Sequence, residues 1–259
     1  MRYARVLGIF WRSALLAESE YRLNFLIAAL SSIGGAAGTL FTMWLLFAGR
    51  GNLSGWAWPE ALVVLGIFLM LDGLIASVLQ PNLSRIVGLV QQGTLDFVLL
   101  KPMDSQFWVS LRNISLWGIP NLLIGIGLLI YGRAHVAGSV GTLWLAPVAL
   151  ALAAGTVYSL WFCIASTTIW FTKVWNATEV LRMMMEAGKY PLAVYPRGWQ
   201  IALTFVLPVA FFTTVPAEMI LGKRPWEWLW LAGGLMLVLL LASRWFWRYA
   251  LRYYTGASA

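Results

Sequence analysis

Long blocks of apolar residues, separated by short polar segments, constrain this chain more than any other feature of its sequence. A helix rises about 1.5 Å per residue, so roughly 20 apolar residues in a row are needed to cross a bilayer. Backbone groups in lipid must bond within their own segment, which favours helices. The sequence therefore predicts an all-α polytopic membrane protein, a single domain over residues 1–259 with about six transmembrane helices, at 24–48, 60–80, 114–131, 143–171, 199–221 and 226–243.

The composition agrees with burial in lipid. Hydrophobic residues make up 61% of the chain and charged residues only 11%, whereas soluble domains carry about 25% charged residues. The formal net charge is +8, but no basic run is longer than two residues. We therefore attribute the basic excess to the Lys/Arg bias that orients membrane proteins, and we expect no nucleic-acid partner.

The N-terminal segment 1–23 has the pattern of a helix that lies in the membrane interface. Arg2, Arg5 and Arg12 fall on one side of a helical wheel. The other side holds the apolar residues Val6, Phe10, Trp11, Ala14 and Leu15. A plain extension of the first span remains the alternative.

The distribution of Lys and Arg predicts the orientation. Both termini and the loops at 83–112 and 172–198 hold 14 of the 18 Lys and Arg residues, and the remaining loops hold four. Because basic residues stay on the cytoplasmic side, both termini and these two loops are expected there.

The two predicted cytoplasmic loops also contain helical patterns. In the first loop, apolar residues recur at helical spacing before a helix end at Gln92-Gly93. In the second loop we expect a short helix over 178–187, with Gly188 as its stop. Simple connectors between spans would be shorter and more polar, so we expect both loops to be structured.

The sequence offers little for catalysis or metal binding. It contains no Gly-x-x-x-x-Gly-Lys-Ser/Thr motif, so we expect no ATP site of that kind in this chain. Cys163 and His135 are the only residues of their types, which excludes a disulfide within the chain and multi-histidine metal sites. We therefore expect a protein that is not an enzyme and that holds no metal or cofactor of its own.

Two acidic residues lie within predicted spans. Asp72 is near the middle of the second span, where a charge is costly unless it faces protein or water. It either lines a substrate path or binds a neighbouring helix or subunit. Glu218 follows Pro216 in a fifth span that Pro208 also breaks, and it either caps a short helix or lies near Lys223 and Arg224.

Glycines and alanines at 34–38 form a small-residue patch on the first span. Such patches usually permit close helix packing. The sequence leaves open whether the packing partner is this chain or another subunit.

Several short motifs, taken in order, resemble the permease subunits of bacterial type-2 ABC transporters over essentially the whole chain. They are Gly93-Thr94-Leu95-Asp96 leading to Leu100-Lys101-Pro102, Tyr195-Pro196 ahead of Leu207-Pro208, Pro216-Ala217, and the tail Arg252-Tyr253-Tyr254.

The resemblance implies a membrane-spanning subunit of an ATP-driven exporter in the bacterial cytoplasmic membrane. It implies a second six-span permease, similar or identical, and a separate pair of ATPase subunits that bind ATP and Mg. Residues that would couple to the ATPase lie in the first cytoplasmic loop (Leu83, Arg85, Ile86, Leu89, Gln92, Gly93, Asp96, Lys101) and the second (Glu179, Arg182, Glu186). Pathway candidates on the first, second and fifth spans are Asp72, Glu218, Pro208 and Pro216.

Two other classes of protein share this topology. A channel or secondary transporter would move solute without an ATPase, and a membrane scaffold would move none. The scarcity of charge within the spans and the lack of a clear internal repeat disfavour the first class.

Overall fold

The computed structural model describes residues 2–19, 22–49, 51–136, 142–171 and 175–255. In this part of the chain almost all regular structure is helical, and the strands are one small antiparallel hairpin, Asn52–Leu53 (β1) with Trp56–Ala57 (β2). The predicted all-α class is confirmed. Residues 1, 20, 21 and 172–174, and Arg50 of the charge count, lie outside the described residues.

Within the described ranges, four helices are long and apolar enough to cross a membrane. They are α2 (Arg22–Phe47), the continuous helix Trp58–Gln91, the helix Leu145–Ile169, and the helix Trp228–Tyr253. Two more elements correspond to the remaining apolar blocks: α7 (Ile119–Ala134), which is shorter, and a pair of helices at Arg197–Val206 and Val209–Ile220 that is bent by 76°. Length and composition thus support four spans, or five if the bent pair is one span.

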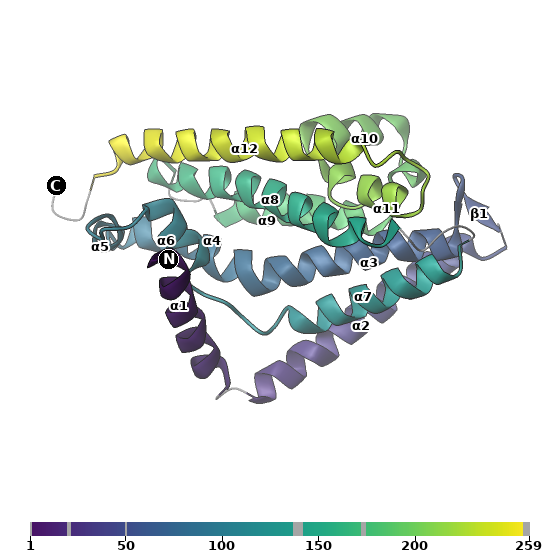
Figure 1. The fold of residues 1–259 in the computed structure, drawn as a ribbon, viewed down its shortest axis with the longest axis horizontal. Coiled ribbons are helices and arrows are strands. Elements are labelled where there is room, and N and C mark those ends of the chain that lie inside the picture. Colours follow the sequence, from purple (N-terminus) through teal and green to yellow (C-terminus); the bar gives the residue numbers. More distant parts are fainter. Residues whose placement is uncertain (1, 20–21, 50, 137–141, 172–174, 256–259) are drawn as a thin grey trace.

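The long helices run side by side, and the short elements gather at the two ends (Figure 1). Three of the long helices are each made of several elements. Helix Trp58–Gln91 consists of α3 (Trp58–Leu74), a π-helical turn Ile75–Leu79 and α4 (Gln80–Gln91). The other two each end in a 3-10 turn: α8 (Leu145–Ser166) is followed by Thr167–Ile169, and α12 (Trp228–Ala250) by Leu251–Tyr253.

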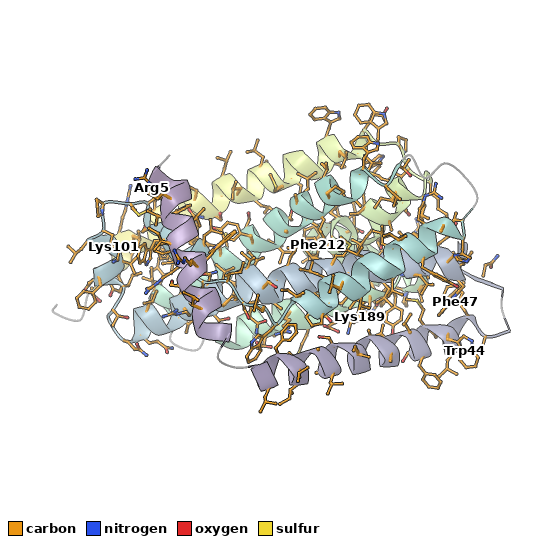
Figure 2. The ribbon with its side chains drawn as sticks, turned by 60° about the horizontal axis from the view of Figure 1, so that its bottom comes forward. Arg5, Trp44, Phe47, Lys101, Lys189 and Phe212 are labelled. Atoms are coloured by element: carbon orange, nitrogen blue, oxygen red, sulfur yellow. The ribbon has the colours of Figure 1, made fainter. Side chains whose placement is uncertain are left out.

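We name the two ends of the molecule by their short elements. The β-hairpin end holds β1, β2 and α11 (Thr214–Ile220), and the α6 end holds α5 (Asp96–Leu99) and α6 (Ser105–Leu111) (Figure 1). Lys101 lies at the α6 end, and Trp44 lies toward the other end (Figure 2). The start of α1 (Arg2–Ser19) and the end of α12 both lie at the α6 end.

Helix α1 crosses the α6 end and does not extend α2 in a straight line (Figure 1). Arg5 and Arg12 are exposed, as the interfacial pattern predicts. On the other face, Phe10 packs edge-on against Trp108 with ring centroids 4.8 Å apart. The indole nitrogen of Trp11 donates to the carbonyl of Leu111 at 3.2 Å. Helix α1 is therefore anchored to α6.

Helices α3 and α7 approach so closely that only glycine fits at their contacts. A Cβ atom on Gly125 would lie 2.6 Å from the carbonyl oxygen of Gly66, and one on Gly73 would lie 2.6 Å from the carbonyl oxygen of Gly118. A Cβ atom on Gly132 would meet the Pro59 carbonyl oxygen at 2.5 Å. Close backbone approach of this kind is how small residues join membrane helices.

The second membrane helix continues past its expected end at Gln80. Pro81 has no backbone N–H and would normally break a helix by leaving a carbonyl four residues earlier without a donor. Here the Ser115 backbone N–H donates to the Ser77 carbonyl at 2.8 Å. The Asn82 side-chain amide donates to the Val78 carbonyl at 2.6 Å. Side chain and loop thus satisfy the freed carbonyls, and the helix runs on to Gln91.

Candidate functional site

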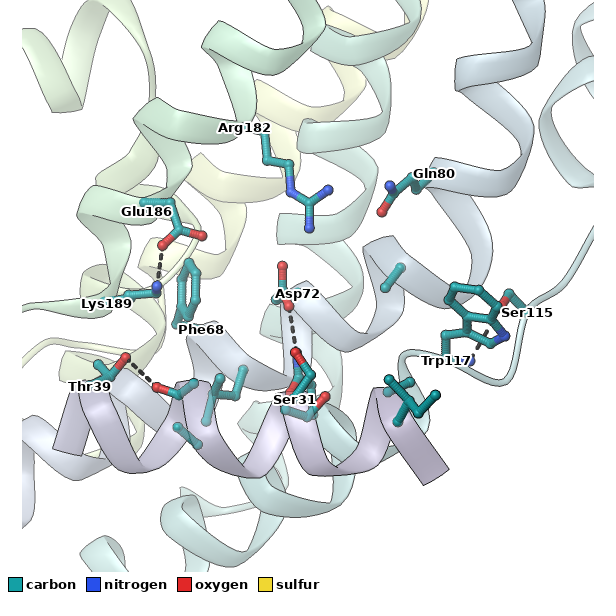
Figure 3. A pocket seen from close by; sticks show the side chains of 18 of the residues that line it. Ser31, Thr39, Phe68, Asp72, Gln80, Ser115, Trp117, Arg182, Glu186 and Lys189 are labelled. Atoms are coloured by element: carbon teal, nitrogen blue, oxygen red, sulfur yellow. Dashed lines mark hydrogen bonds and ion pairs between the residues drawn. The ribbon is translucent and has the colours of Figure 1, made fainter. Parts of the chain in front are cut away.

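A cavity of about 810 Å³ lies between α2, α3 and the helix α9 (Trp175–Met185). Figure 3 shows α2 along one side of this cavity and Asp72 near its centre. Most of its polar side chains come from these three helices. They are Ser31, Ser32 and Thr39 from α2, Asp72 from α3, and Arg182, Glu186 and Lys189 from α9 and the turn that follows it.

Asp72 is fixed in the cavity by α7. The side-chain amide of Asn121 donates to Oδ2 of Asp72 at 2.7 Å. Asn121 follows Pro120 in the first turn of α7, and that helix is held against α3 by the glycine contacts described above. The carboxylate is therefore bonded to a neighbouring helix, as the structural alternative expects, and it also faces the cavity.

Helix α9, in the loop 172–198 that the sequence predicts to be cytoplasmic, packs beside α3 and α8. Arg182 and Glu186 line the same small pocket as Asp72 and Trp161 of α8. Leu181 and Met185 are buried against the side of α8. Because Asp72 is near the middle of the helix Trp58–Gln91, α9 enters the bundle and ends there in a 3-10 turn at Glu186–Lys189.

The charged residues of the second loop that are expected to contact an ATPase lie beside the cavity. Arg182 of α9 and Glu186 of the following turn line it, Glu186 is also exposed, and Glu179 is partly exposed. Their spacing of three or four residues places them along one face of a helix. That face meets a cavity large enough to hold water, which explains how charges are tolerated inside the bundle.

The wall formed by α2 consists of small and hydroxyl-bearing residues. Ser31, Ser32, Gly35 and Thr39 line the cavity at helical spacing. A Cβ atom on Gly34, Gly35 or Gly38 would meet nothing within 4 Å. The three glycines of the patch are thus open beside their Cα atoms in the described part of this chain, whereas Ala36 of the same patch is buried in the core.

Only some of the expected coupling residues lie on the surface of the α6 end. Leu83 and Ile86 are fully buried and fix α4 to the bundle. Leu89, Gly93 and Asp96 are partly exposed, and Arg85, Gln92 and Lys101 are exposed. The apolar residues whose spacing predicted α4 therefore lie on the face of α4 that packs against the bundle. The exposed surface of the α6 end is formed by the C-terminal end of α4 and by α5.

The tip of this region exposes large apolar side chains. Phe97 is 69% exposed and Leu100 is 80% exposed, although both flank the buried Val98. Gly93 has a φ of +66°, which ends α4 and turns the chain into α5. We call residues Gln80–Leu111 the α4–α6 unit.

Polar contacts brace the α4–α6 unit against α8 and α12. Arg244 Nη1 donates to Asp104 Oδ1 at 2.7 Å, and the Asp104 side chain also caps α6 by accepting from Phe107 N. The Arg244 guanidinium holds the pKa of Asp104 below its ordinary value. The Trp247 indole donates to Ser105 at 3.0 Å. Motion of the unit would therefore be transmitted to these helices.

The remaining pathway candidates lie away from the cavity. Glu218 forms an ion pair with Arg224, which agrees with the structural alternative considered for it. Pro208 lies at the 76° bend between the two short helices, and Pro216 is buried in the first turns of α11. None of these three residues lines the cavity.

Sequence reasoning missed Asn121 and the glycines of α7. Gly118, Gly125 and Gly132 repeat every seven residues, and Gly66 and Gly73 have the same spacing in α3. This repeat was the available signal, because residues seven apart lie on one helix face. Asn121 was visible as a lone carboxamide in an apolar block.

The fold and the cavity define a class: a helical multi-pass membrane protein with a polar, charge-lined cavity inside its bundle. A family model described as ABC-2 family transporter protein matches residues 33–258. The chain belongs to this family and is a membrane-spanning permease component. Comparison with curated proteins found no match. Comparison with solved structures found none either.

Proposed function

We propose that the chain is one of two permease subunits of an ATP-driven exporter, and that it forms half of the pathway and couples to a separate ATPase. The observation that carries this proposal is the continuous helix Trp58–Gln91. One continuous helix places Asp72 in the cavity and ends at Gln91, and the short turn 92–95 joins it to the exposed tip of the α4–α6 unit. A push at the tip would thus reach the cavity through this turn and the helix.

The tip has the properties of a docking surface for the ATPase. Phe97, Leu99 and Leu100 are exposed, and they project from a unit braced by Asp104 and Arg244. Exposed Arg85, Gln92 and Lys101 supply polar groups on the same α4–α6 unit. Buried apolar anchors within a polar rim are the usual composition of protein interfaces.

The cavity supports the proposal that a second permease completes the pathway. Helix α2 forms one wall, and only 6% of its most apolar stretch is buried within the chain. A second six-span subunit, similar or identical, would cover the open side of α2. The ATP and Mg that drive the cycle would be bound by the pair of ATPase subunits.

The proposed orientation rests on charge. The α6 end carries the exposed Arg5 and Lys101 (Figure 2), and in this proposal it faces the cytoplasm together with both termini. The β-hairpin end would then face the outside of a bacterial cytoplasmic membrane. The Lys/Arg bias supports this assignment.

Copurification with the ATPase tests the proposal. The tagged chain, extracted in mild detergent, should retain a P-loop ATPase and ATP hydrolysis. Leu100→Asp should lower ATPase recovery more than ten-fold, because a charge would enter an apolar contact. Tyr253→Asp is the matched control, since Tyr253 is 52% exposed and lies at the end of α12, outside the α4–α6 unit.

Two outcomes would contradict the proposal. Equal ATPase recovery with Leu100→Asp and with the native chain would remove the tip as the docking surface. Solute flux in liposomes that contain this chain alone would indicate a channel or secondary transporter, and absence of both flux and ATPase would indicate a scaffold.

A further inference from the structure

Two opposite charges face each other in the cavity without forming an ion pair. Figure 3 shows the Arg182 guanidinium pointing toward the Asp72 carboxylate, from α9 and α3 respectively. Both side chains line the cavity, and Arg182 acts electrostatically on Asp72. Among the described residues, however, the ion pairs within 4.0 Å join other partners.

The other charged groups of the cavity already have partners. Glu186 pairs with Lys189. Lys189 also lies over the Phe68 ring, 5.4 Å from its centroid. Asn121 occupies one oxygen of Asp72 and leaves the other available. Among the described residues, the charged groups of the cavity that lack an ion-pair partner are therefore the Asp72 carboxylate and the Arg182 guanidinium, which differ in sign.

Such an arrangement is costly when the cavity lacks a ligand of matching charge. Charges removed from bulk water are stabilised only by close partners with good hydrogen-bond geometry. Two charges of each sign line the cavity, so a ligand with a net charge would leave an excess of one sign. A ligand carrying both signs would satisfy both open groups and keep the balance.

The size and the remaining lining suit a small polar group with an apolar neighbour. A volume of about 810 Å³ is in the range of small-molecule sites, roughly 300–1,000 Å³. Ile27, Phe68 and Leu69 add apolar surface beside the charges. Ser31, Ser32 and Gln80 add hydrogen-bonding groups.

We propose that this cavity binds a zwitterionic group, with its ammonium against Asp72 and its phosphate or carboxylate against Arg182. The group belongs either to a lipid headgroup or to a soluble zwitterion, and the two share this chemistry. The inference deepens the proposed function, because the bound molecule would be the transported substrate. Binding itself requires no ATPase.

Equilibrium binding to the purified full-length chain in maltoside micelles tests the proposal. The probe is radiolabelled dihexanoyl phosphatidylethanolamine, with three competitors: dihexanoyl phosphatidic acid, which lacks the ammonium, hexylamine, which lacks the phosphate, and glycerophosphoethanolamine, the same phosphodiester without acyl chains. The unlabelled zwitterionic lipid should compete at least ten-fold better than phosphatidic acid or hexylamine, each of which carries charge of one sign only. Competition by glycerophosphoethanolamine at the same concentration would assign a soluble source, and weaker competition would assign a lipid.

Two variants test which residue binds which charged end of the ligand. Arg182→Gln should weaken binding of the zwitterionic lipid at least ten-fold and abolish competition by phosphatidic acid. Asp72→Asn should remove the preference for the zwitterionic lipid over phosphatidic acid. Arg12→Gln and Glu227→Gln change exposed charges outside the cavity and should leave binding unchanged.

Equal binding of all probes, or native binding in both cavity variants, would overturn the proposal. Evidence that Asp72 and Arg182 only stabilise each other would also overturn the proposal. In that case Asp72→Asn and Arg182→Gln would each lower the melting temperature, the double variant would restore it, and no probe would be preferred. Because no ATPase is present, failure here is distinct from failure of the exporter proposal, which rests on copurification.

Discussion

The backbone N–H of Ser115 donates to the carbonyl oxygen of Ser77 at 2.8 Å, where Pro81 cannot supply the helical donor. A loop before α7 thereby completes the hydrogen bonding of the helix that precedes it in the chain. The π-helical turn Ile75–Leu79 lies at the same place. The junction between the cavity half of this helix and the α4 half is thus held by contacts from outside the helix.

Asn82 is the side chain that holds this junction, and its loss should be costly. Its amide donates to the carbonyls of Val78 and Asn113 at 2.6 and 2.7 Å, and its oxygen accepts from Asn113 N at 2.8 Å. It is only 1% exposed. Asn82→Ala would leave buried backbone groups without partners, so the free energy of unfolding should fall by about 2 kcal/mol. Reversible unfolding in mixed micelles measures this.

Ser84→Ala, two residues further along α4, is the control for Asn82→Ala. Ser84 is partly exposed, so its removal should change the free energy of unfolding by no more than about 0.5 kcal/mol. Equal losses in the two variants would show that Asn82 does not hold the junction.

The glycine contacts between α3 and α7 predict a sharp contrast between two neighbouring glycines. A Cβ atom on Gly125 would lie 2.6 Å from the Gly66 carbonyl oxygen and 2.7 Å from Met70 N, whereas one on Gly127 would meet nothing within 4 Å. Gly125→Ala should therefore lower the free energy of unfolding by about 1–3 kcal/mol through overpacking.

Gly127→Ala is the matched control in the same helix. It should raise stability by about 0.5–1 kcal/mol, because alanine loses less conformational entropy in a helix. Thermal melts of both variants in one detergent make the comparison. Equal stability of the two would contradict the close approach of α3 and α7.

The sequence predicted the class of fold because this class depends on local composition. The length of a lipid-buried segment is set by the bilayer, so apolar runs such as 24–48 and 143–171 correspond to α2 and to Leu145–Ile169. The extension beyond Pro81 was not predictable in the same way. It depends on Ser115, which is remote in sequence.

The position of α9 could not be predicted from charge counting. Lys/Arg bias treats every basic residue as a marker of the cytoplasm, but Arg182 and Lys189 line a cavity inside the bundle. Asp72 was found from the sequence because a lone acid in an apolar run is conspicuous. Its opposition to Arg182 is a tertiary relationship between α3 and α9.

Acid should weaken the bracing of the α4–α6 unit. Arg244 lowers the pKa of Asp104 below the ordinary value of 3.8, which the unfolded chain regains. The ion pair therefore contributes its full stability above about pH 3.8, and this contribution is lost as the pH falls through the lower folded-state pKa. Melting temperatures between pH 3 and pH 7 should decline at the acid end.

Asp104→Asn separates the charge from the helix cap. The side-chain carbonyl oxygen of the new asparagine can still accept a hydrogen bond from Phe107 N, but the side chain carries no charge. This variant should be less stable than the native chain at pH 7 and should lose the acid decline. Asp104→Ala should lose about 1 kcal/mol more, because the cap is also removed. An unchanged acid decline in Asp104→Asn would assign the effect to another group.

The orientation can be measured with single cysteines, because Cys163 is the only cysteine of the chain. In a Cys163→Ala background, Asn52→Cys places a thiol on the exposed β-hairpin and Leu100→Cys places one at the exposed tip of the α4–α6 unit. A membrane-impermeant maleimide should label Asn52→Cys in intact cells and Leu100→Cys only in inverted vesicles. The reverse pattern would invert the orientation inferred from the Lys/Arg bias. If both thiols were labelled from the same side, the β-hairpin end and the α6 end would lie on one side of the membrane. In that case the helix Trp58–Gln91 would not cross the membrane.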